Sequence, residues 1–295
     1  MLNGKMKQLI LGGAAAAVLM SSSFAAHAQN INLAVASNFY ISGMLGSSPI
    51  ADLIAAFHKA NPTYTVTVAQ NGATGTLETQ ITGGNGLGVD LFLAADTAHP
   101  QDLVTNYPTL VVGSAFHYAI GTLAFWTNTS SVNVTCGTGG TCGYNSTAYP
   151  KVAIANPSTA PYGVAANTLL TGRYGLASPL SSNPLVDEYT NIDTTFSAVQ
   201  SGSEKVGFVA LSQICSGRTW PTSGNALVYP PTDTSVSPVI FNYSPIIQDA
   251  IKIAHSRTPA QNTELNAFVA YLQDHTSSPP SQMVTTLLNY CYTIP

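Results

Sequence analysis

Hydrophobic and polar residues alternate with two different periods along most of the chain. The segment NINLAVAS (30–37) carries apolar residues at alternate positions, which predicts a strand. Residues 50–62 instead repeat their apolar positions with the period of a helix, from Ile50 to Phe57, and a proline follows the end of that helix. Residues 30–62 are therefore predicted to form a strand followed by a helix.

The same two patterns follow each other along the rest of the chain. Strands are predicted at 64–70, 89–96, 116–127, 151–156, 205–214 and 238–255, and helices at 76–82, 98–106, 164–170, 192–202, 258–275 and 281–291. Alternation of this kind indicates an α/β protein with mostly parallel sheets. The tract 128–147, rich in Gly, Ser and Thr, is interpreted as a surface insertion.

The first residues have the pattern of an export signal. Lys5 and Lys7 precede the apolar run LILGGAAAAVLM, and AHA (26–28) has the A-x-A form of a cleavage site. We therefore expect residues 1–28 to be a signal peptide that sends a soluble protein to the periplasm. The apolar run is too short for a membrane span, and no later segment reaches the ~20 apolar residues that a span needs.

Charged residues are rare, at 7% of the chain, whereas 45% of residues are hydrophobic. The formal net charge is −4, and loss of the two lysines in the predicted signal takes it to −6. So few basic residues do not indicate the basic surface that nucleic-acid-binding proteins carry, and we expect no nucleic-acid partner. The length is sufficient for two lobes of ordinary size.

Four cysteines follow the predicted signal, and an even count in an oxidising compartment favours disulfides. Cys136 and Cys142 enclose a short glycine-rich loop and are predicted to pair, which leaves Cys215 to pair with Cys291. Free thiols or a metal site are the alternatives. A C-x5-C spacing with no histidine nearby is a poor zinc pattern.

Four polar turns stand at the ends of predicted strands or the starts of predicted helices. They are Ser37-Asn38-Phe39, Asn71 to Gly75, Ala160 to Gly163, and Thr190 to Asp193. Ligands of open α/β sheets bind beyond the carboxyl ends of strands. Helix capping explains each turn when it is taken alone. Four such turns with almost no charge favour a small anion, because helix N-termini offer free N–H groups and a partial positive charge.

These blocks resemble the periplasmic molybdate-binding proteins, the solute receptors of molybdate ABC transporters. The resemblance rests on NLAVASNF, on NGATGTLETQITGG followed by VDLFLAAD, and on YAIGTLAFW, IANPSTAPYGVAA, NIDTTFSAV and GFVALSQI, all in the family's order. It covers nearly all of the chain after the predicted signal. It implies a type II periplasmic-binding-protein fold, with two lobes, a mostly parallel sheet flanked by helices in each, and a ligand cleft between them.

The resemblance also implies lobe boundaries, because the chain of such a protein crosses between the lobes twice. The first lobe is expected to comprise residues 29–116 plus 240–295, and the second lobe residues 117–239. The two crossings are expected near 115–119 and 232–242.

Site residues follow from the resemblance position by position. Ser37 and Thr74 match the two hydroxyl ligands of the oxyanion, and Asn38 matches a position that can also donate. Tyr162 and Ile192 match positions that donate their backbone N–H groups, so a Tyr162→Phe substitution is expected to do little. The resemblance implies no cofactor and no metal cation bound directly by the protein, because the metal belongs to the oxyanion.

Two departures from the family pattern concern the site. Some members place a tyrosine hydroxyl in the site at a position that here is Ala210. The segment YISGMLGSS (40–48) resembles an insertion before the first helix. We expect it to displace the N-terminus of that helix from the anion.

The leading hypothesis is therefore a monomeric, non-enzymatic receptor that binds molybdate or tungstate and delivers it to a membrane ABC permease. A receptor of the same fold for sulfate or a phosphate-like oxyanion is the alternative. An enzyme is disfavoured, because neither G-x-S-x-G nor H-E-x-x-H occurs. Asp90 and Asp96 flank FLAA and resemble a carboxylate pair, but we interpret them as local structural acids.

Overall fold

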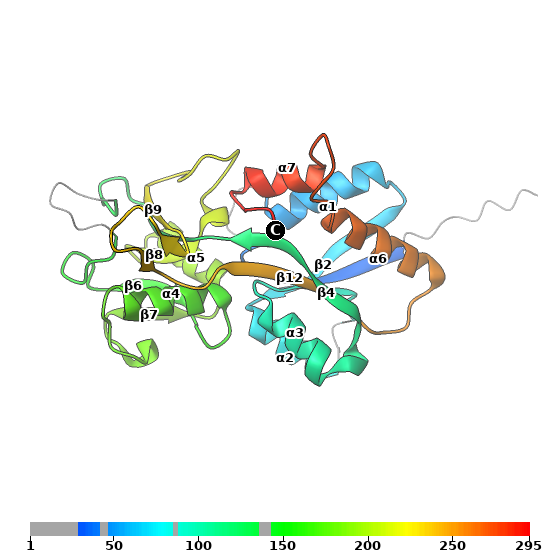
Figure 1. The fold of residues 1–295 in the computed structure, drawn as a ribbon, viewed down its shortest axis with the longest axis horizontal. Helices are drawn as coiled ribbons and strands as arrows, with labels where there is room; N and C mark the ends of the chain where they lie inside the picture. The colour runs from blue at the N-terminus through cyan, green and yellow to red at the C-terminus, as the bar shows by residue number, and fades with distance from the viewer. Residues whose placement is uncertain (1–28, 42–46, 85–87, 136–142) are drawn as a thin grey trace, which may run out of the picture.

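The computed structural model describes residues 29–41, 47–84, 88–135 and 143–295, which form two lobes (Figure 1). The sheet of the first lobe has the order β2-β1-β3-β12-β4. β1 pairs in parallel with β2 and β3, whereas β12 runs antiparallel to β3 and β4. The strands are β1 (Gln29–Ala36), β2 (Tyr64–Gly72), β3 (Leu91–Leu93), β4 (Val111–Gly121) and β12 (Ile246–Ile253).

The second lobe repeats this arrangement with the order β7-β6-β8-β5-β9. β6 is parallel to β7 and β8, and β5 is the one strand reversed against its neighbours. The strands are β5 (Leu123–Thr127), β6 (Val152–Ala155), β7 (Val186–Tyr189), β8 (Gly207–Ala210) and β9 (Asn225–Tyr229). The prediction of an α/β protein with two lobes and mostly parallel sheets is confirmed.

Helices cover both sheets. Those of the first lobe are α1 (Pro49–Ala60), α2 (Thr74–Thr82), α3 (Ala98–Asn106), α6 (Pro259–Leu272) and α7 (Gln282–Asn289). Those of the second lobe are α4 (Pro161–Gly172) and α5 (Ile192–Ser201). Among the described residues, no helix is long and apolar enough to cross a membrane.

Two neighbouring strands, β4 and β12, extend from the first lobe toward the second (Figure 1). β4 pairs with β12 as far as Gly121, and β5 of the second sheet starts at Leu123. The return path runs from β9 to β12 through a small antiparallel ribbon of β10 (Thr232–Asp233) and β11 (Ile240–Phe241). The expected lobe boundaries stay a prediction.

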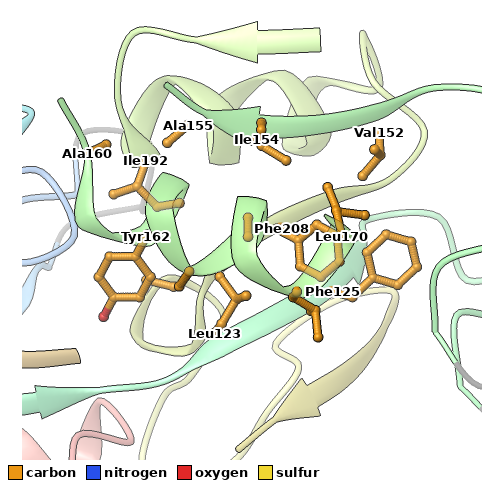
Figure 2. Close-up of a cluster of buried hydrophobic side chains, with 14 of the residues drawn as sticks. Leu123, Phe125, Val152, Ile154, Ala155, Ala160, Tyr162, Leu170, Ile192 and Phe208 are labelled. Carbon is orange, nitrogen blue, oxygen red and sulfur yellow. The ribbon is translucent and has the colours of Figure 1, made fainter. Parts of the chain in front are cut away.

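Each sheet packs against its helices around buried hydrophobic side chains. In the second lobe, Leu123 and Phe125 of β5 and Ile154 of β6 pack with Leu170 of α4 and Phe208 of β8 (Figure 2). Removal of such side chains from water is the main favourable term in folding, at about 25 cal/mol per Å² of apolar surface. The same cluster extends to Ala36, Ala73 and Ala95 of the first lobe.

A disulfide joins the lobes. Cys215, shortly after β8, is bonded to Cys291, just after α7, with a Cα–Cα distance of 6.0 Å. The predicted pairing of these two cysteines is confirmed. The predicted pair Cys136–Cys142 lies outside the described residues, as does the predicted signal 1–28.

The predicted elements differ from the structure mainly where a hydrophobic run continues through a bend. The single strand expected at 116–127 is wrong, because β4 ends at Gly121 in one sheet and β5 begins at Leu123 in the other. The segment 238–255 divides in the same way into β11 and β12. The predictions omitted β7 and β9.

Candidate functional site

A small cavity lies between the lobes, where the ends of β1 and β2 meet the first turns of α2, α4 and α5. It is lined by Ala36, Ser37, Asn38, Gly72, Ala73, Thr74, Ala95, Ala160, Pro161, Tyr162 and Ile192. Its volume is about 10 Å³, close to the space needed by one water molecule, which excludes an organic metabolite. None of these lining residues is charged.

The turn after β1 brings Ser37 and Asn38 to the cavity. The backbone N–H of Ser37 donates to the carbonyl of Gly72 at 3.0 Å, and that of Phe39 donates to Ala36 at 2.9 Å, which closes the turn. Ser37 is 3% exposed. Within the described residues the Ser37 hydroxyl has no hydrogen-bond partner, so it is available to a ligand.

Thr74 begins α2, directly after Ala73 as the N-cap. Its Oγ1 accepts a hydrogen bond from the backbone N–H of Ala95 at 3.0 Å, and the side chain is buried. Because the oxygen is engaged as an acceptor, the hydroxyl hydrogen is left to donate. The contact with Ala95 thus holds Thr74 as a donor beside Ser37.

The first turn of α4 offers backbone donors from the second lobe. Ala160 is the N-cap and supplies no side-chain cap, Pro161 has no N–H, and the helical ladder starts with Val164 N–H donating to Ala160. No carbonyl in the described part of the chain accepts from the N–H of Tyr162. Gly163 lets this turn approach β6, since a Cβ there would lie 2.3 Å from the carbonyl oxygen of Ala155.

α5 begins in a similar way at Ile192. The side chain of Asn191 caps this helix by accepting from the N–H groups of Asp193 and Thr194, each at 2.9 Å. The carbonyl of Ile192 accepts from Gln213 Nε2 at 3.2 Å, which fixes the peptide from behind. Among the described residues, no carbonyl accepts a hydrogen bond from the backbone N–H of Ile192. Asp193 is not among the residues that line the cavity.

The cavity therefore combines hydroxyl and backbone donors at three helix N-termini. Such groups stabilise an anion through hydrogen bonds and through the positive end of the helix dipole. No carboxylate lines the cavity to accept a proton from a protonated anion. Among the described residues, no group of three or more His, Cys, Asp or Glu side chains could hold a metal ion.

All five site residues predicted from the sequence line this one cavity. Ala210 does not line it, and its N–H donates to Gln213 Oε1 at 3.0 Å. Of the segment 40–48, residues 42–46 lie outside the described residues. The hydroxyl of Ser48 caps α1 by accepting from the backbone N–H of Ala51 at 3.3 Å. No residue of α1 lines the cavity, and the displacement expected from the insertion stays a prediction.

Sequence reasoning missed a buried contact behind the cavity. Gln248 of β12 donates from Nε2 to the hydroxyl of Tyr162 at 3.2 Å. In Figure 2 the Tyr162 hydroxyl points away from the aliphatic side chains of the second lobe's core. Burial raises the pKa of this hydroxyl well above its usual range, so it stays neutral. The only sequence signal was a polar pair, Gln248 and Asp249, inside an apolar strand.

A larger groove of 370 Å³ also lies between the lobes, formed by residues 95–99, the first half of α4 and residues 243–247. Beside it, His99 Nδ1 lies 2.7 Å from Asp96 Oδ2, and His99 Nε2 lies 3.8 Å from Glu78 Oε2. The hydrogen bond with Asp96 raises the pKa of His99, and burial raises the pKa of Glu78. Asp90, the other acid that flanks FLAA, lies 2.7 Å from His255 Nε2. Asp90 and Asp96 therefore bond to different histidines and not to each other.

Comparisons with known proteins agree with this geometry. Residues 8–278 match the family described as bacterial extracellular solute-binding protein. The molybdate-binding protein ModA of Azotobacter vinelandii is 31% identical over 84% of this chain and 86% of its own length. ModA of Rhodobacter capsulatus is 30% identical over 89% of this chain and 90% of its own length. The structure of the Azotobacter vinelandii periplasmic molybdate-binding protein matches with a TM-score of 0.69 and 25% identity, covering 90% of this chain and 99% of that one.

Proposed function

Because the chain belongs to the family of bacterial extracellular solute-binding proteins, we propose that it is a receptor for molybdate or tungstate. Two ModA proteins that share about 30% of its residues over most of their length support this ligand. The ligand would sit between the lobes and be held by Ser37, Asn38, Thr74, Tyr162 and Ile192.

The observation that carries the proposal is the neutral lining of the inter-lobe cavity. A tetrahedral dianion brings oxygens that only accept, and the hydroxyls of Ser37 and Thr74 and the free backbone N–H groups of the lining residues can donate to them. A hydrogen bond from a neutral donor to a charged acceptor contributes about 1.5–3 kcal/mol. Several such bonds hold a dianion without a lysine or arginine.

The rest of the function follows from the family. The family is one of solute-binding receptors, so the protein would carry out no catalysis and require no cofactor. Residues 1–28 would direct it to the periplasm as a cleavable signal. There it would act as a monomer and deliver the oxyanion to a membrane ABC permease.

Sulfate is the second candidate ligand. The same neutral donors suit any fully ionised tetrahedral dianion, so the chemistry of the lining alone does not separate sulfate from molybdate. Cavity size is what would discriminate, because sulfate is the smaller ion. Hydrogen phosphate is disfavoured, because no carboxylate lines the cavity to accept its proton.

Isothermal titration of residues 29–295 with molybdate, tungstate, sulfate and phosphate tests the proposal. We expect submicromolar binding of molybdate and tungstate and no measurable binding of the other two. Tight binding of sulfate with weak binding of molybdate would reassign the ligand. No binding of any of the four anions would contradict an oxyanion receptor of this kind.

A further inference from the structure

Gln248 lies at the centre of the strand pair that connects the lobes. It belongs to β12, pairs with Ala119 of β4 and is fully buried. A buried amide costs free energy unless its donors and acceptor are satisfied. The structure gives Gln248 partners on several elements, and two of these partners line the cavity.

One partner is Asn38 in the first lobe. Gln248 Oε1 accepts from Asn38 Nδ2 at 3.0 Å, and the same nitrogen donates to the Tyr292 hydroxyl at 2.9 Å. Both amide hydrogens of Asn38 are therefore engaged behind the cavity. The backbone N–H is the donor that Asn38 retains for a ligand.

The other partner is Tyr162 in the second lobe, whose hydroxyl accepts from Gln248 Nε2 at 3.2 Å. This contact needs glycine at position 121, where a Cβ would lie 2.0 Å from the Tyr162 hydroxyl and 2.7 Å from Gln248 Nε2. Gly121 ends β4, at the point where the chain leaves the first lobe. The contact thus lies at the crossing between the lobes.

Gln248 is fixed to the first lobe independently of Tyr162. The hydroxyl of Tyr118 lies 2.9 Å from Gln248 Oε1 and 2.8 Å from the carbonyl of Ala94. β12 also pairs with β3 of the same sheet. A rotation of the second lobe would therefore separate Tyr162 from Gln248 and leave Asn38 and Tyr118 in place.

We propose that Gln248 is a positioning residue of the anion site, which holds Tyr162 of the second lobe against Asn38 of the first lobe when the lobes are closed. This inference rests on the proposed function. Tyr162 lies in the first turn of α4, so a bond that holds its ring also holds the backbone N–H that faces the ligand. The family resemblance gave the Tyr162 hydroxyl no role. Here it accepts the hydrogen bond that fixes its helix to Gln248.

A double-mutant cycle with tungstate as the probe tests this inference. The four proteins are residues 29–295 of the wild type, Gln248→Met, Tyr162→Phe and the double variant. We expect each single substitution to weaken tungstate binding about threefold to tenfold, mainly through faster dissociation. The double variant is expected to bind no more weakly than the weaker single variant, because both remove the same bond.

Tyr243→Phe is the matched control, because the Tyr243 hydroxyl is also buried near the crossing but bonds to Tyr229 and Leu123 rather than to Gln248. Its effect on affinity should be small and should multiply with that of Gln248→Met. Unfolding of the ligand-free proteins supplies a second readout. A coupling that appears there and not in tungstate affinity would mean a merely structural contact and would overturn the proposal.

Other outcomes are equally decisive. Independent losses for Gln248→Met and Tyr162→Phe, with tight wild-type binding, would overturn the role of Gln248 and leave the proposed function intact. If Gln248→Met fails to fold, Tyr162→Phe tests the same bond from the other lobe, and an unchanged dissociation rate would overturn the proposal. Failure of the wild type to bind molybdate and tungstate would instead remove the proposed function, and this inference with it.

Discussion

The first lobe brings two side-chain hydroxyls to the cavity, those of Ser37 and Thr74, whereas the second lobe brings backbone N–H groups, those of Tyr162 and Ile192. A hydroxyl donor is lost when its side chain is replaced. A backbone donor survives replacement of its own side chain but moves with its helix. The two halves of the site should therefore respond to different substitutions.

Placement of the second lobe's donors depends on residues that do not donate themselves. Gly163 allows α4 to lie close to the end of β6, and Asn191 caps α5 so that Ile192 N–H is the one left. In the first lobe, by contrast, two donors are the side-chain hydroxyls of Ser37 and Thr74, and Asn38 adds one backbone N–H. Substitutions in each half of the site, and in the contacts between the lobes, test this difference.

The largest effect is expected for the bond that joins the lobes rather than for either half of the site. Replacement of Cys215 and Cys291 by serine removes a cross-link over 76 residues of sequence. Loss of a native disulfide typically lowers the free energy of unfolding by about 2–5 kcal/mol. Urea unfolding of the variant and the wild type measures this change.

Neither cysteine lines the cavity, so the double variant should keep its preference for molybdate and tungstate. Treatment of the wild type with a reductant should lower its stability at least as much, because a reductant also opens the predicted Cys136–Cys142 bond. Equal stability of the two proteins would show that the cross-link does not constrain the unfolded chain as supposed.

The next largest effect is expected on molybdate affinity when a first-lobe hydroxyl, that of Ser37 or Thr74, is removed. Thr74→Ala and Ser37→Ala should each weaken molybdate binding by about 1–3 kcal/mol, as for a lost hydrogen bond to a charged group. Thr74→Ala should be the more severe, because the N–H of Ala95 also loses its acceptor. Titration calorimetry measures both, with Thr74→Ser as the control that keeps the hydroxyl. Unchanged affinity in both alanine variants would refute the role of this half.

A smaller effect is expected in the backbone half. Asn191→Ala removes a helix cap and should lower the free energy of unfolding by about 1 kcal/mol. Molybdate affinity should fall less than in Thr74→Ala, because the Ile192 N–H remains. Ile192→Val, which keeps the same N–H, is the matched control and should bind as the wild type does. A large loss of affinity in Ile192→Val would show that its side chain and not its backbone contacts the ligand.

The smallest effect is a dependence of stability on pH. Burial raises the pKa of Glu78 above its ordinary 4.5 and that of Asp249 above 3.8, and the bond to Asp96 raises that of His99 above 6.5. A folded-state pKa above the unfolded value means that the folded state binds more protons. Each contribution to stability is therefore complete below the unfolded pKa and is lost as pH rises through the folded pKa.

We accordingly expect these three groups to make the urea midpoint higher at pH 5 than at pH 7.5, against the opposite contribution of His275, whose pKa is lowered by burial. His99→Gln should reduce the part of this slope that lies above pH 6.5. Glu78 and Asp102 also face His99, and their charges favour its protonated form. A midpoint that declines steadily from pH 7.5 to pH 5 would contradict the expected direction.

Much of the fold could be predicted because its elements bury one regular face. β1 and α1 appear in the sequence as alternation and helical repeat, and the structure has them within a residue or two of the predicted bounds. The bend between β4 and β5 left no trace in the sequence, because apolar residues continue across Gly121. β7 was missed because its four residues, VDEY, include two acids.

The residues around the cavity were predictable for a different reason. They occupy turns at strand ends, where polar residues are visible in the sequence, and family resemblance selected five of them. Gln248 was not predictable in this way, because it lies within a strand and has no motif around it. Its partners, Asn38 and Tyr162, are 210 and 86 positions away, so only the folded chain brings them together.

A crystal structure of the protein with tungstate, in which anomalous scattering locates the metal, tests the proposed anion site most directly. We expect one tungsten position in the inter-lobe cavity. Its oxygens should lie within hydrogen-bond distance of the Ser37 and Thr74 hydroxyls and of the N–H groups of Asn38, Tyr162 and Ile192. A tungsten position outside this cavity, or an anion held by a lysine, arginine or histidine, would contradict the proposed site.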